Sequence, residues 1–397
     1  MKKKVFAVVL AAVMAASLAA CGGGSGASTA APTESKAAES TAPAAESTAP
    51  AAEGAQKIGI SMPTQSLERW NRDGKYLEEK FKAAGYETIL TYSDNKSDRQ
   101  VNDIQNMIAE NVDLLIVAAI DGVALNTAMN EAAEADIPVI SYDRLILNDA
   151  VSYYVSFDNY TVGQLQGTFV EKELDLENAG DKVYNIEFTA GDPADNNAGY
   201  FFNGAYDVLA PYIEAGTLNV VSGQKDFVSV ATDQWSTDTA LERAQNLLGS
   251  YYADGTQLDV WLCSNDSTAL GVAQAITSDY AGSNSVIITG QDGDEANLKN
   301  IVDGIQTMTV YKNVANEAIV TLGLAEAMLK GETIDASLCD TFGIECAFDT
   351  ESYETSAGNK CPSFLLVPSV ITKDNLEELV DTGLYTMGAD GYLSATN

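Results

Sequence analysis

The feature that most constrains the fold is a regular alternation of short β-rich runs and longer helical stretches, which begins at Lys57. Successive strands start about 20 to 30 residues apart, which is the spacing of a right-handed β–α–β unit. The run from Leu114 to Ile120 is apolar throughout, as expected of a parallel strand that is covered on both faces. Because the alternation occurs in two series of similar size, the sequence predicts an α/β chain with two doubly wound parallel-sheet lobes.

The elements of each series are expected at definite positions. The strands of the first series are expected at 57–63, 87–93, 112–120 and 137–142, with an extended segment at 151–157. Its helices are expected at 66–84, 97–110 and 122–135. The second series has strands at 183–190, 218–223, 258–264, 285–290 and 305–311, and helices at 161–175, 198–214, 236–250, 267–279 and 294–303. A helix at 313–331, a strand near 364–371 and a short helix after Thr372 complete the pattern.

The charge balance excludes several classes of function. Among 397 residues the chain has 22 Lys and Arg, 57 Asp and Glu and no His, which gives a net charge of −35. Nucleic-acid binding is disfavoured because a phosphate backbone needs a basic surface. The lack of histidine rules out Ser-His-Asp and Cys-His catalysis, His-containing zinc sites and HExxH proteases. No GxGxxG or Walker A motif follows a predicted strand, so we expect no nucleotide cofactor. We expect no other cofactor, and no metal, since cysteines without histidine make an incomplete metal site.

The first residues of the chain resemble a bacterial export signal. Three lysines, Lys2 to Lys4, precede sixteen uncharged residues, 5–20, which are fewer than the ~20 that a membrane-spanning helix needs. The run ends in Leu18-Ala19-Ala20-Cys21, which resembles a lipobox. The resemblance implies that residues 1–20 are removed and that Cys21 is acylated as the new N-terminus. The alternative is a plain signal peptide with an unmodified cysteine.

Residues 21–56 are expected to form a linker behind this lipid anchor. Residues 22–55 are almost only Gly, Ala, Ser, Thr, Pro and Glu, and the heptapeptide ESTAPAA at 39–45 is repeated at 46–52. Such a composition cannot bury enough apolar surface to fold. We therefore expect a disordered tether that holds a folded head away from the outer face of the cell membrane.

Charged and amide side chains follow nearly every predicted strand. Arg69 follows the first strand, Asp143 and Arg144 follow the fourth, and Asp292 and Lys312 follow the last two strands of the second series. Ligands of doubly wound sheets bind just beyond these strand ends. Because carboxylates accept hydroxyl hydrogen bonds and Arg and Lys donate them to hydroxyl and ring oxygens, the pattern favours a polyhydroxyl ligand.

Aromatic side chains add to this pattern. Trp70 and Trp235 fall in predicted loops or helix starts, where they could pack on the apolar face of a sugar ring. These groups also have plain structural explanations, since the tryptophans could be core residues and Asp143 a cap or turn residue. Acidic residues after strands, such as Asp195 and Asp294, are often only helix N-caps.

Six segments of the folded part carry a resemblance to a known family. They are Ile60–Thr64 with Arg69-Trp70, Val139–Leu145, Tyr153–Asn159, Asp195–Ala198, Ser264–Asp266 with Ala269–Gly271, and Gly290–Gly293. With these segments in this order, residues 57–397 resemble the periplasmic binding proteins of the ribose/galactose/xylose type, which serve ATP-driven sugar importers. Within that type they resemble the D-xylose-binding and multiple-monosaccharide-binding proteins most.

The resemblance implies a type I, or Venus-flytrap, arrangement of two α/β lobes joined by three crossings, with the sugar in the cleft. It implies a first lobe of 57–159 and 313–362 and a second lobe of 160–312 and 363–397, or alternatively a C-terminal tail that returns to the first lobe. The sugar contacts that it implies are Asp143, Arg144, Asn197, Asn265, Asp292 and Lys312, the stacking aromatics Trp70 and Trp235, and as further contacts Arg69, Glu187, Asn196 and Asp266.

The segment 336–361 is longer than the resemblance implies, and it contains Cys339, Cys346 and Cys361. Export permits a disulfide, and closure of Cys339 or Cys346 onto Cys361 is one hypothesis. Cys263 lies in an apolar predicted strand, so we expect it to be an inert core residue.

The predicted function is a monomeric, lipid-anchored binding protein outside the cytoplasm. Its lobes close over a monosaccharide, an aldose such as xylose, glucose, galactose or arabinose, and present it to the permease and ATPase subunits of an ABC importer. A sensor that presents bound sugar to a membrane receptor would use the same closed state. A glycoside hydrolase could use Asp143, Asp266 and Asp292 without histidine, but Arg144 would lower the pKa of Asp143 where a general acid needs a raised one.

Overall fold

A seven-stranded sheet forms the first half of the architecture. The computed structural model describes residues 54–356 and 358–396. In this sheet the strand order is β11-β12-β5-β4-β3-β1-β2. The strands are β1 (Lys57–Met62), β2 (Glu87–Tyr92), β3 (Leu114–Val117), β4 (Val139–Tyr142), β5 (Val151–Phe157), β11 (Cys346–Asp349) and β12 (Ser363–Leu366). All neighbours pair in parallel except β11 and β12, which confirms the parallel α/β prediction for the first series.

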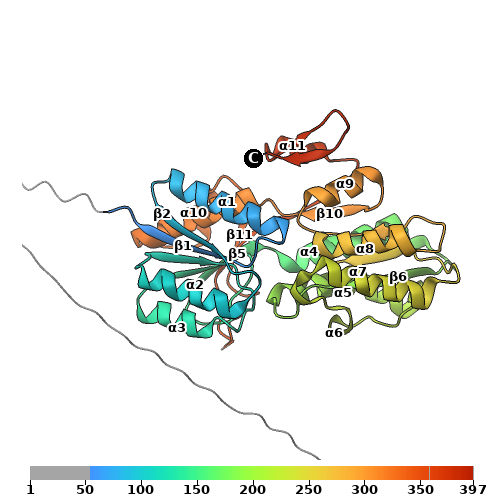
Figure 1. The fold of residues 1–397 in the computed structure, drawn as a ribbon, viewed down its shortest axis with the longest axis horizontal. Helices are drawn as coiled ribbons and strands as arrows, with labels where there is room; N and C mark the ends of the chain where they lie inside the picture. Colours follow the sequence, from blue (N-terminus) through green and yellow to red (C-terminus); the bar gives the residue numbers. More distant parts are fainter. Residues whose placement is uncertain (1–53, 357, 397) are drawn as a thin grey trace, which may run out of the picture. The chain divides into compact units, whose positions relative to one another are not determined.

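Helices cover both faces of this sheet (Figure 1). One face carries α1 (Glu68–Ala83) and α10 (Val314–Lys330), whose apolar side chains pack with those of β1. The other face carries α2 (Ser97–Ala109) and α3 (Asn126–Glu134). We call this sheet and its helices the first lobe. Helix α10 follows the second series along the chain but packs in the first lobe, so the chain has crossed back before it.

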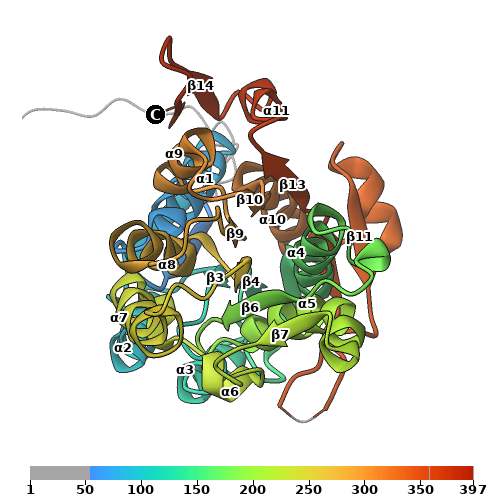
Figure 2. The same ribbon diagram turned by 90° about the vertical axis from the view of Figure 1, so that its right-hand side faces the viewer.

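The second lobe is built on a four-stranded parallel sheet of order β7-β6-β8-β9. Its strands are β6 (Tyr184–Thr189), β7 (Leu218–Val220), β8 (Val260–Cys263) and β9 (Ile287–Ile288). Its helices are α4 (Asn159–Glu173), α5 (Asn196–Ala215), α6 (Phe227–Val230), α7 (Thr237–Leu247), α8 (Asp266–Asp279) and α9 (Glu295–Asp303). Helices α4 and α5 cover one face and α7 and α8 the other (Figure 2).

The predicted strand near 364–371 is in fact two strands that belong to different sheets. Strand β12 pairs with β5 of the first lobe, whereas β13 (Ser369–Thr372) pairs antiparallel with β10 (Met308–Tyr311). The expected boundary between 362 and 363 is therefore wrong, because the chain leaves the first lobe only after Leu366. The apolar sequence continues across the crossing, so hydrophobicity alone does not mark it. The crossing is instead made by the exposed Val367 and by Pro368, which cannot donate to a ladder.

A small C-terminal unit was missed by the sequence analysis, which expected only a helix there. Helix α11 (Glu377–Asp381) is followed by a hairpin of β14 (Tyr385–Met387) and β15 (Leu393–Ala395) (Figures 1 and 2). Leu379, Tyr385 and Leu393 form a core with Leu298 and Ile301 of α9. Strands of three residues are too short to show a period of two in the sequence.

The cysteines of the segment 336–361 lie on opposite faces of the first sheet. Cys339, in the short 3-10 helix η4 (Ala336–Thr341), and Cys346 of β11 belong to the core under α1 and α10, and their Sγ atoms are 3.6 Å apart. Cys361 belongs to the core under α2 and α3. Cys346 pairs with Leu366, five residues beyond Cys361 and hence about 16 Å along the strand. Closure onto Cys361 is therefore wrong, and the described cysteines are all free.

A buried carboxylate fixes the turn between β9 and α9. The side chain of Asp266, the first residue of α8, accepts backbone N–H bonds from Gly293 and Asp294, both at 2.9 Å. The turn needs this support because Asp292 has φ of +107°, a conformation that costs free energy in a non-glycine residue. Burial and the nearby Asp292 raise the pKa of Asp266 to about 7.

Oxidised glutathione is expected to link Cys339 and Cys346 in the folded chain. Each thiol loses its hydrogen as the disulfide forms, and the glutathione disulfide is reduced to two thiols. The pair is favoured because its sulfur atoms already lie 3.6 Å apart, and a bond needs about 2 Å. Mass spectrometry of alkylated peptides should find Cys263 and Cys361 alkylated. A link that includes Cys361 would contradict the packing described above.

Asp266→Asn is expected to flatten the pH dependence of stability. The folded chain holds the Asp266 proton up to about pH 7, whereas an unfolded aspartate loses it near pH ~4. The free energy of unfolding therefore falls as the pH rises between these values. Between pH 5 and pH 8 the wild type should lose on the order of 2 kcal/mol more than the variant, measured by urea unfolding. The variant Asp238→Asn, at an exposed position, should keep the wild-type dependence of the unfolding free energy on pH. If Asp266→Asn also kept it, the raised pKa of Asp266 would be contradicted.

Candidate functional site

One pocket collects side chains from both lobes at the carboxyl ends of their strands. It contains about 360 Å³ of unfilled space, including its opening, which is in the range of small-molecule sites. Its lining residues are Leu67, Arg69, Trp70, Asp143, Arg144, Phe201, Trp235, Asn265, Ser267, Gln291, Asp292 and Lys312. This is the place where doubly wound sheets bind their ligands.

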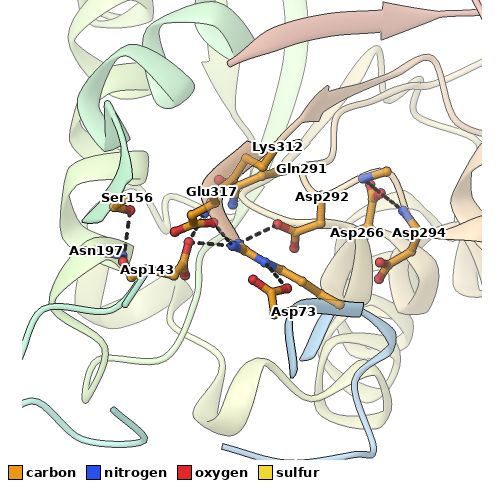
Figure 3. Close-up of polar contacts among 12 residues, drawn as sticks. Asp73, Asp143, Ser156, Asn197, Asp266, Gln291, Asp292, Asp294, Lys312 and Glu317 are labelled. Carbon is orange, nitrogen blue, oxygen red and sulfur yellow. Dashed lines mark hydrogen bonds and ion pairs between the residues drawn. The ribbon is translucent and has the colours of Figure 1, made fainter. Parts of the chain in front are cut away.

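Arg69 is the centre of this pocket. Its guanidinium donates to Asp143 at 2.6 Å, to Asp292 at 3.1 Å, and to Asp73 and Glu317 at 3.2 Å each. Figure 3 shows that these four carboxylates converge. Burial by itself would lower the pKa of Arg69, but the four carboxylates outweigh it and hold this pKa well above its usual range. Because Asp143 follows β4 and Asp292 follows β9, one side chain of α1 joins the two lobes.

Asp143 is shared by two cations. Its Oδ2 accepts from Arg69 and, at 2.5 Å, from the Nζ of Lys312. Burial alone would raise the pKa of Asp143, but these two cations outweigh it and hold the pKa below its usual range. The backbone carbonyl of Asp143 accepts from Ser156 at 3.0 Å and from Asn197 at 2.6 Å (Figure 3). The Asp143 carboxylate is thus held ionised and in one place, as a hydrogen-bond acceptor.

A second ionic contact crosses between the lobes at Arg144. Its Nε lies 3.0 Å from Oδ2 of Asp195, which also accepts from the indole N–H of Trp235 at 3.2 Å. Asp195 is in addition the N-cap of α5, where it accepts from the backbone of Asn197. The guanidinium of Arg144 lies over the ring of Trp70, 4.8 Å from its centroid. Arg144 and the rings of Trp70 and Trp235 therefore line the pocket, while Asp195 holds Arg144 from the second lobe.

Eight of the twelve predicted site residues line the pocket, namely Arg69, Trp70, Asp143, Arg144, Trp235, Asn265, Asp292 and Lys312. The other four do not line it. Asn197 donates to the backbone carbonyl of Asp143, and Asp266 accepts from the turn that carries Asp292. Asn196 is the first residue of α5. Glu187 is buried in β6, where it accepts from Ser222 and Tyr252.

Four lining residues were not predicted: Leu67, Phe201, Ser267 and Gln291. Gln291 directly precedes Asp292 at a strand end, so its position was a usable signal. Its Nε2 donates to the carbonyl of Ser264, and its buried Oε1 has no partner within the described part of the chain. Phe201 lies one helical turn after Asn197 in α5. An apolar residue in a helix is expected in the core, so sequence alone gives no sign of its role.

The described residues contain no group of three His, Cys, Asp or Glu side chains that could hold a metal ion. No helix within residues 54–356 and 358–396 is long and apolar enough to cross a membrane. What the pocket offers is a set of fixed, paired charges and amides beside aromatic rings, an arrangement suited to binding a neutral polar molecule.

Comparison with known proteins places this architecture in a family. A family model described as the periplasmic binding protein domain matches residues 58–333. The chain is 37% identical to the multiple sugar-binding periplasmic receptor ChvE of Rhizobium radiobacter, over 83% of this chain and 90% of the relative. It is 32% identical to the D-xylose-binding periplasmic protein of Escherichia coli (strain K12), over 82% of this chain and 89% of the relative.

Solved structures agree with these relatives. An ABC transporter solute binding protein from Clostridium phytofermentans with bound β-D-glucose is 45% identical, with a TM-score of 0.78 over 83% of this chain and 98% of that one. A carbohydrate transporter solute binding protein from Chloroflexus aurantiacus in complex with D-glucose is 29% identical, with a TM-score of 0.73 over 86% of this chain and 100% of that one. The chain therefore belongs to the periplasmic binding protein domain family, in the sugar-binding type that the sequence resemblance predicted.

Proposed function

We propose that this chain is an extracytoplasmic solute-binding lipoprotein that captures a monosaccharide between its two lobes and delivers it to an ABC importer. The observation that carries the proposal is the pocket in which Arg69 of the first lobe binds both Asp143 and Asp292, beside the rings of Trp70 and Trp235. A ligand that contacts both lobes favours their closed state, since its affinity for that state is higher.

The chemistry of the lining suits sugar hydroxyls. Asp143 and Asp292 are acceptors, Asn265 both donates and accepts, and Lys312 donates. Gln291 brings a buried acceptor oxygen without a partner among the described residues, and a hydroxyl would satisfy it. Because the carboxylates are already paired with Arg69 and Lys312, the site needs little rearrangement to receive a neutral polyol.

An aldose is the proposed ligand class, with glucose and xylose the first candidates. Two structural relatives hold glucose, and the curated relatives are named for D-xylose and for multiple sugars. Galactose and arabinose remain in the proposed class, because they differ from these two sugars only in configuration.

Binding is favoured over hydrolysis by the state of Asp143. A glycosidase needs a carboxylic acid with a raised pKa at the ligand. The cations around Asp143 hold its pKa below the usual range, and Asp266, whose pKa is raised, does not line the pocket. We therefore propose that the pocket performs no chemistry on its ligand. A sensor would use the same closed state, with a membrane receptor in place of a permease.

The lipid anchor is part of the proposal. Cys21 and the tether 21–56 lie outside the described residues, except for the last three of the tether, 54–56. The lipobox-like Leu18-Ala19-Ala20-Cys21 supports acylation at Cys21, which would hold a monomer at the outer face of the cell membrane beside the permease and ATPase subunits.

Asp292→Ala is expected to weaken sugar binding by about 10- to 100-fold in titration calorimetry with D-glucose. The change removes a hydrogen-bond acceptor from both Arg69 and a sugar hydroxyl, which makes the free energy of sugar binding less favourable by about 1–3 kcal/mol. Asp238→Ala, an exposed change in the same lobe, should bind like the wild type. Unchanged affinity of Asp292→Ala would remove this residue from the site. If xylose, arabinose, glucose and galactose all failed to raise the melting temperature of the wild type, the sugar proposal itself would fail.

Cys21→Ser is expected to release the chain from membranes. The thiol is the acylation site that the lipobox implies, and serine offers no thioether link. After cell fractionation the wild type should sediment with membranes and label with a palmitate analogue, while the variant should be found in the soluble fraction. Cys361→Ser, which changes a buried core cysteine, is the control and should stay membrane-bound. Sedimentation of both variants would contradict anchoring at Cys21.

A further inference from the structure

A second arginine of α1 reaches across to the other lobe without entering the pocket. Arg72 lies three residues after Arg69, so both side chains leave the same side of the helix. Arg69 lines the pocket, and Arg72 does not. Arg72 donates instead to two backbone carbonyls of the β9–α9 turn, to Asp292 at 3.1 Å and to Gly293 at 2.9 Å. The two arginines thus hold Asp292 at two places, one at its carboxylate and one at its backbone.

The other strong contacts of Arg72 also lie in the second lobe. It donates to Asp294 at 3.0 Å and to the hydroxyl of Tyr385 at 2.8 Å. That hydroxyl in turn donates to the carbonyl of Gly293 at 2.8 Å. Only a 3.5 Å contact with Glu68 comes from its own helix. The Arg72 side chain is 12% exposed, so these bonds are largely shielded from water.

Glu68 extends the same junction. Its Oε1 accepts the backbone N–H of Glu295, the first residue of α9, at 3.1 Å. The first turn of α1 therefore docks on the turn that carries Asp292, whose φ of +107° needs external support. Asp266 supplies that support from inside the second lobe and Arg72 from the first lobe. In the described conformation, Arg72 therefore contributes several of the hydrogen bonds that join the first turn of α1 to the second lobe.

We propose that Arg72 is a closure latch, a positioning residue that stabilises the closed lobes without touching the ligand. The inference rests on the proposed function as a sugar-binding protein. When binding requires the closed state, the apparent dissociation constant is the intrinsic one divided by the closed fraction. The latch therefore changes the apparent dissociation constants of all sugars by the same factor. Residues that line the pocket, such as Asp292, determine the preference among sugars.

The test uses the full chain in detergent, with D-glucose and D-xylose as probes. Calorimetry measures both affinities, and small-angle X-ray scattering measures the radius of gyration with and without sugar. Arg72→Ala should weaken both sugars by tenfold or more, with their ratio unchanged, and should enlarge the ligand-free radius. Arg72→Lys keeps the charge but loses the forked donor, so its affinities for both sugars should lie between those of the wild type and those of Arg72→Ala. Arg99→Ala, which removes an exposed arginine of α2, is the matched control and should behave as wild type.

Each of the other outcomes contradicts the proposal that Arg72 stabilises the closed lobes. Unchanged affinities for Arg72→Ala would show that the contacts do not bear on closure. A changed glucose-to-xylose ratio would show that Arg72 acts on the ligand contacts, directly or through the turn that carries Asp292, rather than on closure alone. If Arg72→Ala does not fold, Tyr385→Phe removes one hydroxyl of the latch and should weaken both sugars about threefold; no change would refute the proposal. If the wild type binds neither sugar, the proposed function fails, and the ligand-free radius of Arg72→Ala against wild type still decides the latch.

Discussion

The buried guanidinium of Arg69 is the interaction on which the rest of the site depends. Its four carboxylate partners come from α1, from the ends of β4 and β9, and from α10, so both lobes and one crossing must be in place before it is fully paired. A buried ion left without partners is costly. Burial and the nearby Asp143 raise the pKa of Glu317 well above its usual range, so Glu317 retains its proton more readily than an exposed glutamate.

Much of the fold could be predicted from periodicity, and the two elements that were missed have different physical causes. Long β–α–β units are recognisable from their periodicity. The helices and strands from β1 to α10 fall close to the predicted ranges, except for the four-residue helix α6, for which no range was predicted. The crossing after Leu366 was missed, although Pro368 and Ser369 interrupt the apolar residues there, because the apolar residues on either side look the same whether the chain stays in one sheet or changes sheets. The hairpin β14–β15 is held by packing on α9 rather than by its own sequence, so no local pattern shows it.

The site shows a similar limit. A sequence can place a residue at the end of a strand, but it cannot say toward which side the chain aims it. Asp266 and Asp292 both follow strands of the second lobe, yet one is turned inward to fix a backbone turn and the other lines the pocket. Glu187 lies within β6, where successive side chains face opposite ways, and its partners Ser222 and Tyr252 draw it into the interior. Residue type selects the candidates; geometry divides them into groups that bind and groups that support.

The pairing of β12 with β5 has a consequence for how the chain is made. Ser363 lies beside Tyr154, more than 200 residues earlier, and closure of so long a loop is slow compared with local folding. The first sheet therefore cannot be completed while its later strand is still being synthesised, however early its first five strands emerge from the ribosome. The same crossings that join the lobes of the finished protein delay completion of the first sheet until most of the chain has been synthesised.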